Sequence, residues 1–423
     1  MKSVASSGRH ARKDRVARRS RPVLAFASAA AAAAILSAVP LFAQGGDSIL
    51  GGRPNPDLAD RVRGVPQRPA PVSEDQLPTR DLKLPRGFKA ETYASGIADA
   101  RSLRIGDKGT VFVGNRTGDK VYAVVDRGGR HETITIASGL DRPNGLAFKD
   151  GALYVAQGTK ISRLEAIEDN LDKTPKPVVI DSDFPDHIAH GWKFLSIGPD
   201  NKLYVSVGAP CNICEPPAGT AQIRRLNLDG SDSETFALGV RNSLGFDFHP
   251  ITKELYFTDN GREGLSDELP NDELNRVTKG GQHFGFPYCH QGDLPDPAFG
   301  LQHACSGFVP PVAKLGAHVG ALGMRFYTGA MFPLRYRNGI FIARHGSSIM
   351  RNKSGGDVIF VTLNSNGSVR SSEPFIAGFL KNNAYIGQPA DIEMMKDGTL
   401  LVSDDYAGAI YRISYGGGRA AAP

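Results

Sequence analysis

Six segments of the chain share one pattern, in which an apolar strand, a polar turn and a second apolar strand follow each other. They begin at Ser102, Gly145, Leu195, Gly245, Arg337 and Asp391. Four of them turn through Asp-Gly, Pro-Asp or Asp-Lys-Gly, the Gly245 segment turns through His249, Pro250 and Lys253, and the Arg337 segment keeps only its second strand clearly. A repeat of about 45–50 residues with several short strands is typical of β-propeller blades. The pattern predicts an all-β fold, a six-bladed β-propeller, with its chemistry on loops at one mouth of the central channel.

The chain before the first repeat divides into two parts of different composition. Residues 2–21 hold eight basic residues and one acidic residue, and an apolar, alanine-rich stretch follows as far as Ala43. This order is typical of a secretory signal peptide, which we assign to residues 1–43. Residues 44–80 are rich in Pro, Gly, Arg and Asp without periodicity and are predicted to be a linker. The propeller is predicted to occupy residues 81–418.

Two other interpretations of the first segment stay open. Arg18 and Arg19 permit export by the twin-arginine route. The apolar run is also just long enough to span a bilayer if it is not cleaved, and contact with a membrane is expected only in that case. Otherwise the protein is expected to be periplasmic or secreted.

The basic charge of the chain belongs to this first segment. The whole chain has a formal net charge of +6 at pH 7, and eight basic residues against one acidic residue give the segment +7, which leaves −1 for the rest. The composition therefore gives no support to nucleic-acid binding.

The four cysteines form two closely spaced pairs. Cys211 and Cys214 form a C-x-x-C motif, and Cys289 and Cys305 flank a loop of 15 residues. An even, small number of cysteines in an exported protein favours disulfides, here 211–214 and 289–305. A zinc site built from all four is the alternative.

Two loops just ahead of blade strands carry side chains suited to chemistry. A histidine at position 190 would point into the channel mouth, where it would act as a general base. A histidine hydrogen-bonded within a surface loop is the alternative. Arg241 and Asn242 hold the same position one blade later and would hold an oxyanion or a carboxylate. An arginine that closes a salt bridge between blades is the alternative there.

A third loop concentrates carboxylates among glycine and asparagine residues. Carboxylates and free backbone carbonyls suit calcium, although the spacing is not that of an EF-hand. A solvated acidic loop is the alternative. The carboxylates are Asp259, Glu263, Asp267, Glu268, Asp272 and Glu273.

Taken together, these segments resemble the glucose/sorbosone dehydrogenases, six-bladed propellers that use pyrroloquinoline quinone. The resemblance extends over most of residues 82–416. It is carried by the His190 loop with IGPDNKLYVSVG, and by GVRNSLGFDF, TDNGREGLSDELPNDELN, HFGFPYCHQGD, LGMRFYTGAMFP, HGSSIMR and the closing PADIEMMKDGTLLVSDDYAGAIYRISY. The segments FGFPYCHQGD and HGS are more similar to the sorbosone-type branch than to the soluble glucose dehydrogenases.

The resemblance implies a role for each of these residues. His190 stands where the family has the general base that takes the proton from the anomeric hydroxyl, after which hydride passes to the quinone C5. Arg241 would steady the C5 oxygen, and Asn242 would help to hold the cofactor. The backbone carbonyls of Gly261 and Arg262 would bind the calcium that polarises the C5 carbonyl. The remaining carboxylates would belong to loop structure or to a second calcium site: Asp267, Asp272 and Glu273.

Two positions depart from the pattern of the soluble glucose enzymes. Those enzymes have Gly-Pro where this chain has Gly261-Arg262, and an arginine that grips the cofactor's carboxylates where this chain has Gln388. Their cofactor lysine also has no clear counterpart. The candidates for that positive charge are Arg344, Arg351 and Lys353, ahead of His345.

We therefore predict a dehydrogenase that oxidises C1 of an aldose, or the aldehyde hydrate of a sorbosone-type sugar, to a lactone or an acid with pyrroloquinoline quinone and calcium. Its electrons would pass to an external acceptor, because the chain shows neither a haem-attachment motif nor a nicotinamide fingerprint. Two alternatives stay open. One is a calcium-dependent propeller lactonase, and the other is a sugar-binding propeller without turnover.

Overall fold

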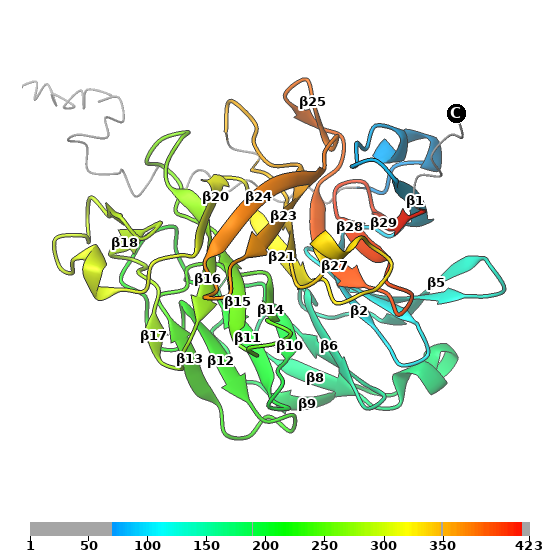
Figure 1. Ribbon diagram of the computed structural model, residues 1–423. Helices are drawn as coiled ribbons and strands as arrows, with labels where there is room; N and C mark the ends of the chain where they lie inside the picture. Colours follow the sequence, from blue (N-terminus) through cyan, green and yellow to red (C-terminus); the bar gives the residue numbers. More distant parts are fainter. Residues whose placement is uncertain (1–69, 188, 348–349, 417–423) are drawn as a thin grey trace, which may run out of the picture. The chain divides into compact units, whose positions relative to one another are not determined.

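The computed structural model describes residues 70–187, 189–347 and 350–416. These residues form a six-bladed β-propeller, which confirms the fold predicted from the repeats. Figure 1 shows the blades following one another in chain order. The predicted signal peptide of residues 1–43 and the linker as far as residue 69 lie outside the described residues. Within the described part of the chain, no helix is long and apolar enough to cross a bilayer.

Each blade is a four-stranded antiparallel core sheet, and we name it after its innermost strand. The first three blades are β2 (Ala100–Ile105), β3 (Val111–Asn115), β4 (Val121–Asp126) and β5 (His131–Ala137); β6 (Gly145–Lys149), β7 (Ala152–Ala156), β8 (Ile161–Leu164) and β9 (Val178–Asp181); and β10 (Leu195–Ile197), β11 (Leu203–Val207), β12 (Gln222–Leu226) and β13 (Glu234–Leu238). The other three are β14 (Phe246–Phe248), β15 (Leu255–Asp259), β16 (Asn271–Val277) and β20 (Ala313–Ala317); β21 (Ala321–Phe326), β22 (Ile340–Arg344), β23 (Asp357–Leu363) and β24 (Val369–Ile376); and β27 (Pro389–Met394), β28 (Leu400–Asp404), β29 (Ala409–Tyr415) and β1 (Phe88–Ala94).

Short elements decorate the blades. An insertion between β16 and β20, residues 278–312, holds β17 (Gln282–His283), which pairs in parallel with β13, and the hairpin β18 (Cys289–His290) with β19 (Leu294–Pro295). A second hairpin joins β25 (Leu380–Lys381) to β26 (Ala384–Tyr385). The 3-10 turns are η1 (Glu74–Gln76), η2 (Pro78–Arg80), η3 (Ile167–Asp169), η4 (Leu171–Lys173), η5 (Cys305–Gly307) and η6 (Leu334–Tyr336).

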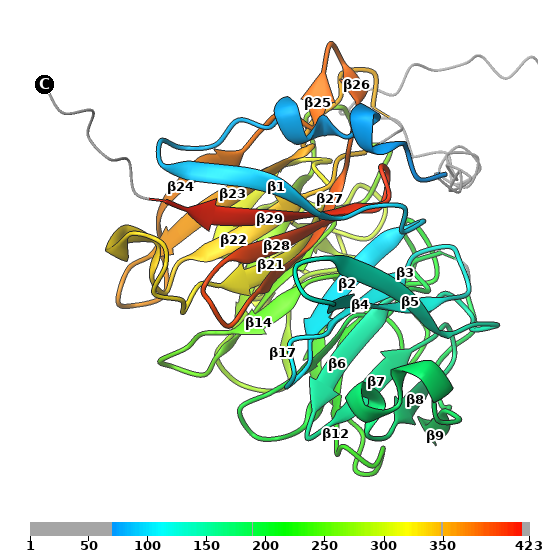
Figure 2. The same ribbon diagram turned by 90° about the vertical axis from the view of Figure 1, so that its right-hand side faces the viewer.

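The ring is closed by pairing between the two ends of the propeller. β1, from the start of the described residues, pairs with β29 as the outer strand of the last blade, and Figure 2 shows the two side by side. Apolar side chains fill the six interfaces between adjacent blades. At the closing interface, Leu103 of the β2 blade and Leu401 of the β27 blade belong to one buried cluster. Both faces of every blade are covered by neighbouring blades. Strands such as β3, β11 and β28 are therefore buried along their whole length and consist mostly of apolar residues.

The predicted linker extends too far toward the C-terminus. Residues 70–80 lie on the propeller, where the Val72 amide bonds to the Ala407 carbonyl at 3.1 Å and Leu77 is buried in a core cluster. A lone leucine in a stretch rich in Pro and Gly has no periodicity, so the sequence pattern did not show that it is buried.

The mouth of the channel is the end of the propeller at which the innermost strand of each blade begins and the second strand of that blade ends. Antiparallel pairing places the first residue of one strand beside the last residue of the other, as in the pairs Ala321–Arg344 and Pro389–Asp404. Side chains just before β10 and β14, or just after β3, β15 and β28, therefore share this end. The pairing of β2, β21 and β27 shifts register there, and such irregularities redirect side chains.

Candidate active site

His190 lies at the mouth, five residues before β10, in a form suited to a base. Its φ of +50° is a conformation that residues other than glycine rarely adopt, so the surrounding contacts fix it. The ring Nδ1 lies 2.9 Å from the Ala209 carbonyl, which only accepts, so Nδ1 carries the proton and Nε2 keeps a free lone pair. Burial lowers the pKa of His190 well below its ordinary value, and the charge of Arg241 lowers it further. The ring is therefore a neutral acceptor at pH 7.

Arg241 is buried and held by three acceptors. Its Nε donates to the Asn212 carbonyl at 2.9 Å, one Nη to the Asn212 Oδ1 at 2.8 Å, and the other Nη to the Asn260 carbonyl at 3.1 Å. All three acceptors are neutral, so the positive charge of the guanidinium is oriented without being cancelled by a contacting carboxylate. Such a fixed cation can stabilise negative charge that develops on a bound group.

Asn212 is a site residue that the sequence interpretation missed. Besides holding Arg241, its Oδ1 accepts from the Glu263 amide at 2.8 Å, and its Nδ2 donates to the Glu263 carbonyl at 3.0 Å. The residue lies inside the Cys211–Cys214 disulfide, which confirms the predicted pairing. Its place within a C-x-x-C loop was the signal available in the sequence. The disulfide loop therefore ties Arg241 to the loop that follows β15.

Asn242 keeps one polar atom free beside Arg241. The backbone amides of Arg241 and Asn242 donate to the two oxygens of Asp259, at 2.8 and 2.6 Å. Burial raises the pKa of Asp259 to about 7, although both bonds oppose this. The Asn242 Nδ2 donates to Asn260, whereas its buried Oδ1 has no partner among the described residues. An unpaired buried acceptor is costly, so this oxygen is suited to meeting a donor on a bound molecule.

The loop after β15 presents two backbone carbonyls without partners. Within the described residues, no hydrogen bond reaches the carbonyl oxygen of Gly261 or of Arg262. Hard oxygen donors of this kind are the ligands that calcium prefers. The predicted carbonyl ligands therefore suit a calcium ion.

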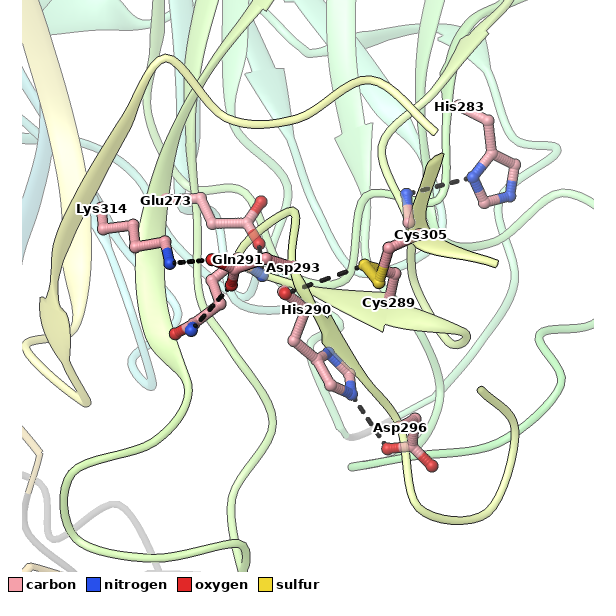
Figure 3. The surroundings of a disulfide bond; sticks show 10 residues. Glu273, His283, Cys289, His290, Gln291, Asp293, Asp296, Cys305 and Lys314 are labelled. Atoms are coloured by element: carbon pink, nitrogen blue, oxygen red, sulfur yellow. Dashed lines mark hydrogen bonds and ion pairs between the residues drawn. A yellow bond between two sulfur atoms is a disulfide. The ribbon is translucent and has the colours of Figure 1, made fainter. Parts of the chain in front are cut away.

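The replacement of the family's proline by Arg262 leaves these carbonyls unobstructed. The Arg262 side chain is fully buried and turns toward the insertion, where it pairs with Asp296 at 2.7 Å. His290 Nε2 lies 2.9 Å from the same carboxylate, as Figure 3 shows beside the Cys289–Cys305 disulfide. That disulfide confirms the second predicted pairing and excludes the zinc alternative. Arg262 thus fastens the loop to the insertion.

The structure does not bring together the carboxylates of the predicted second calcium site. Asp272 and Glu273 are consecutive residues of β16, so their side chains leave opposite faces of the strand, and Asp267 is exposed. Asp272 accepts from the Gly261 and Ala321 amides. In the described part of the chain, no group of three His, Cys, Asp or Glu side chains is placed to hold a metal. Asp272 and Glu273 therefore hold backbone amides in place rather than converging on one metal.

The predicted cofactor cations lie on the mouth side of the β21 blade, where Arg344 ends β22 and the other two follow in the loop before β23. Arg344 donates to Asp357 and to the Leu315 carbonyl, so its fork is fully used between strands. Arg351 is exposed, and Lys353 is fixed through its backbone amide, 2.7 Å from Asn383. Their roles in binding stay predictions.

Gln388 is at the mouth, as its place before β27 implied. Its side-chain amide donates to the His345 carbonyl at 3.2 Å, and its backbone amide donates to Asp404 at 2.9 Å. The side chain is thus turned into the wall and supplies no charge.

Trp192 packs between blades at the mouth. The half-buried indole packs against Leu244, Leu322 and Ala390, which lie at the mouth ends of three different blades. Its Nε1 donates to the Arg116 carbonyl, at 2.7 Å, after β3. The indole thus joins four blades beside His190.

Comparison with known proteins gives the same family as the motifs. The family model described as Glucose / Sorbosone dehydrogenase matches residues 147–412. An uncharacterized protein of Borreliella burgdorferi is 34% identical over 351 residues, which cover 80% of this chain and 92% of that protein. Quinoprotein glucose dehydrogenase B of Acinetobacter calcoaceticus is 25% identical over 252 residues, covering 47% of this chain and 52% of that enzyme.

Solved structures share the fold at lower identity. A carbohydrate-active enzyme of family AA12 from Trichoderma reesei has a TM-score of 0.66 at 20% identity, over 82% of this chain and 98% of that one. The pyranose dehydrogenase PQQ domain of Coprinopsis cinerea has a TM-score of 0.65 at 16% identity, over 79% and 97%. The family model spans more than half of this chain, and the Borreliella relative aligns with most of it. The chain therefore belongs to the glucose/sorbosone dehydrogenase family.

Proposed function

We propose that this protein oxidises C1 of an aldose, or the aldehyde hydrate of a sorbosone-type sugar, to a lactone or an acid. Pyrroloquinoline quinone would accept the two electrons, and a calcium ion would act as a Lewis acid beside it. The observation that carries the proposal is the neutral His190, whose free Nε2 lies in the same mouth as the fixed cation of Arg241. Family membership and the quinone-dependent relative support this assignment.

His190 performs the proton step. Its Nε2 takes the proton from the hydroxyl on the sugar's C1, while Nδ1–H stays bonded to Ala209. The Ala209 carbonyl then stabilises the imidazolium that forms, because it accepts a hydrogen bond that strengthens with the charge. A depressed pKa keeps the base ready in its neutral form.

Arg241 and Asn242 would hold the cofactor and polarise it. The guanidinium is prealigned by Asn212 and Asn260, so it stabilises developing negative charge without first reorganising. The free Oδ1 of Asn242 would accept a hydrogen bond, and the carbonyls of Gly261 and Arg262 would ligate the calcium ion.

The proposed setting is periplasmic or secreted, with an external electron acceptor. The two disulfides support an oxidising compartment, where such bonds persist. The lactonase alternative has less support, because it needs several side-chain carboxylates around one metal, and the described residues offer none so arranged.

The proposal is tested by reconstitution. The protein is mixed with calcium and pyrroloquinoline quinone, and dye reduction is followed over a panel of aldoses and sorbosone, with quinone-free and calcium-free controls. We expect sugar-dependent reduction that needs both additions. Absence of reduction with every sugar, while lactones are hydrolysed, would assign the protein to the hydrolases.

A further inference from the structure

Two arginines at the mouth share one carboxylate. Arg101 lies where the pairing of β2 shifts register, and its guanidinium bonds to Asp405, which follows β28. His345 Nε2–H donates to the other oxygen of Asp405 at 2.8 Å. Arg116 lies 3.7 Å from the oxygen that Arg101 already uses. Within the described residues, Asp405 is the carboxylate within ion-pair distance of both arginines, and the charge of Asp99 also acts on Arg101.

Arg116 is the arginine left without hydrogen bonds. Among the described residues its guanidinium donates none, and its buried Nε has no partner. The nearby Asp99 accepts from Thr117 and Gly118 through Oδ2, and no hydrogen bond among the described residues joins its Oδ1 to Arg116. The Arg116 side chain is 25% exposed, against 7% for Arg101, so a solute in the mouth can reach it. A buried donor without a partner is rare in native proteins and calls for an acceptor.

Trp192 connects this arginine to the site already described. The Arg116 guanidinium lies 5.5 Å from the centre of the indole ring, and the indole N–H bonds to the Arg116 carbonyl. Trp192 follows His190 by two residues. Gln388 lies in the same sector, because it contacts His345, which contacts Asp405. Arg116 thus brings positive charge to the sector where the neutral Gln388 brings none.

We propose that Arg116, supported by Trp192, is an anion subsite that binds a carboxylate of the aromatic polycarboxylate cofactor. This inference rests on the proposed function. The planar guanidinium matches a carboxylate in a two-pronged hydrogen bond, and it has donors to spare. Arg101 and His345 occupy Asp405, which prevents Asp405 from neutralising Arg116 fully. The chain therefore replaces a cofactor arginine of the last blade by one from the first.

Binding rather than turnover tests the subsite. Trp192 is the chain's single tryptophan, so its emission reports on this mouth. The full chain is titrated with pyrroloquinoline quinone, and separately with benzene-1,3,5-tricarboxylate, which carries the charge but no quinone. Equilibrium dialysis measures the bound ligand independently. The variants are Arg116→Gln and Arg116→Lys. The matched control is Arg276→Gln, which removes another ion-paired arginine stacked on an aromatic ring, at the far end of its blade.

We expect Arg116→Gln to raise the Kd of both ligands by about tenfold or more, which is the loss expected for one charged hydrogen bond, and to weaken the salt dependence. Arg116→Lys should recover part of the affinity, and Arg276→Gln should leave it unchanged. Equal Kd values for wild type and Arg116→Gln would overturn the subsite, even if the enzyme oxidises sugars. Tricarboxylate binding that depends on Arg116, without any sugar oxidation, would support the subsite and contradict the proposed function. No binding of either ligand by the wild type would overturn the inference.

Discussion

Asn212 should control how well Arg241 is positioned, and Asn212→Ala measures this. The substitution removes the acceptor of one Arg241 Nη, at 2.8 Å, together with both side-chain bonds to Glu263. It keeps the Asn212 carbonyl that accepts from Arg241 Nε. Arg241 would then be held at Nε and one Nη only, and the Glu263 end of the loop would be released.

The magnitude follows from these three bonds. A hydrogen bond to a charged group contributes about 2 kcal/mol and a neutral one about 1 kcal/mol, so the free energy of unfolding should fall by about 3 kcal/mol when water restores part of the loss. If the bond to the guanidinium acts fully in the transition state, its loss lowers kcat roughly thirtyfold. Asn212→Asp keeps an acceptor for Arg241 but places a carboxylate against the guanidinium, so its kcat should fall as well, because the charge of Arg241 is then partly cancelled.

Two assays separate the effects. Chemical denaturation gives the free energy of unfolding, and the dye-linked assay with saturating quinone gives kcat. The control is Asn227→Ala, in the β12–β13 turn of the same blade, because the Asn227 side chain bonds only to the exposed side chains of Ser231 and Asp232. If Asn212→Ala matched Asn227→Ala in both assays, the claim that Asn212 holds Arg241 would be wrong.

Three further predictions follow from single contacts. Desolvation and the charge of Arg241 depress the pKa of His190. The plot of kcat/KM against pH should therefore rise below pH 6.5 and stay flat from there to pH 8. A midpoint of that rise above pH 7 would refute a neutral base. Asp296→Asn should lower the free energy of unfolding by about 3 kcal/mol or more, because it leaves the buried Arg262 without its ion pair. Asp293→Asn breaks the exposed pair with Lys314 that Figure 3 shows and should lower it by under about 1 kcal/mol. Equal losses in the two variants would contradict this prediction. Chelation of calcium should abolish dye reduction and calcium should restore it; full activity in chelator would remove the role given to the loop carbonyls.

The sequence predicted the fold well because each blade carries its own local signal. Five blades show both inner strands in one short segment, four of them with a shared turn chemistry, and that pattern needs no long-range information. The exception was the first strand of the β21 blade, Ala321–Phe326, because residues 327–339 separate it from β22. The other blades join their two inner strands by short turns, so both strands fall within one local pattern.

The clearest signal for candidate site residues was a position shortly before a blade strand. His190, Arg241 and Asn242 satisfy that condition. Arg344 does not, because it ends strand β22. Its guanidinium forms an ion pair with Asp357 on the neighbouring strand β23.

Long-range contacts explain the residues that were missed. Asn212 and Arg116 gain their roles from contacts with residues 29 and 76 positions away, namely Arg241 and Trp192. Only the folded ring sets such separations, so no local pattern reveals them.

The most direct test of the account is a single turnover followed on the quinone itself. Wild type and His190→Ala are loaded with pyrroloquinoline quinone and calcium, binding is confirmed by dialysis, and sugars are added without oxygen or dye. We expect the wild-type quinone spectrum to change to that of the reduced cofactor, and His190→Ala to bind the quinone but reduce it at least about a hundredfold more slowly. Reduction at equal rates in both proteins, or none in the loaded wild type with any aldose or sorbosone, would contradict the claim that His190 drives sugar oxidation.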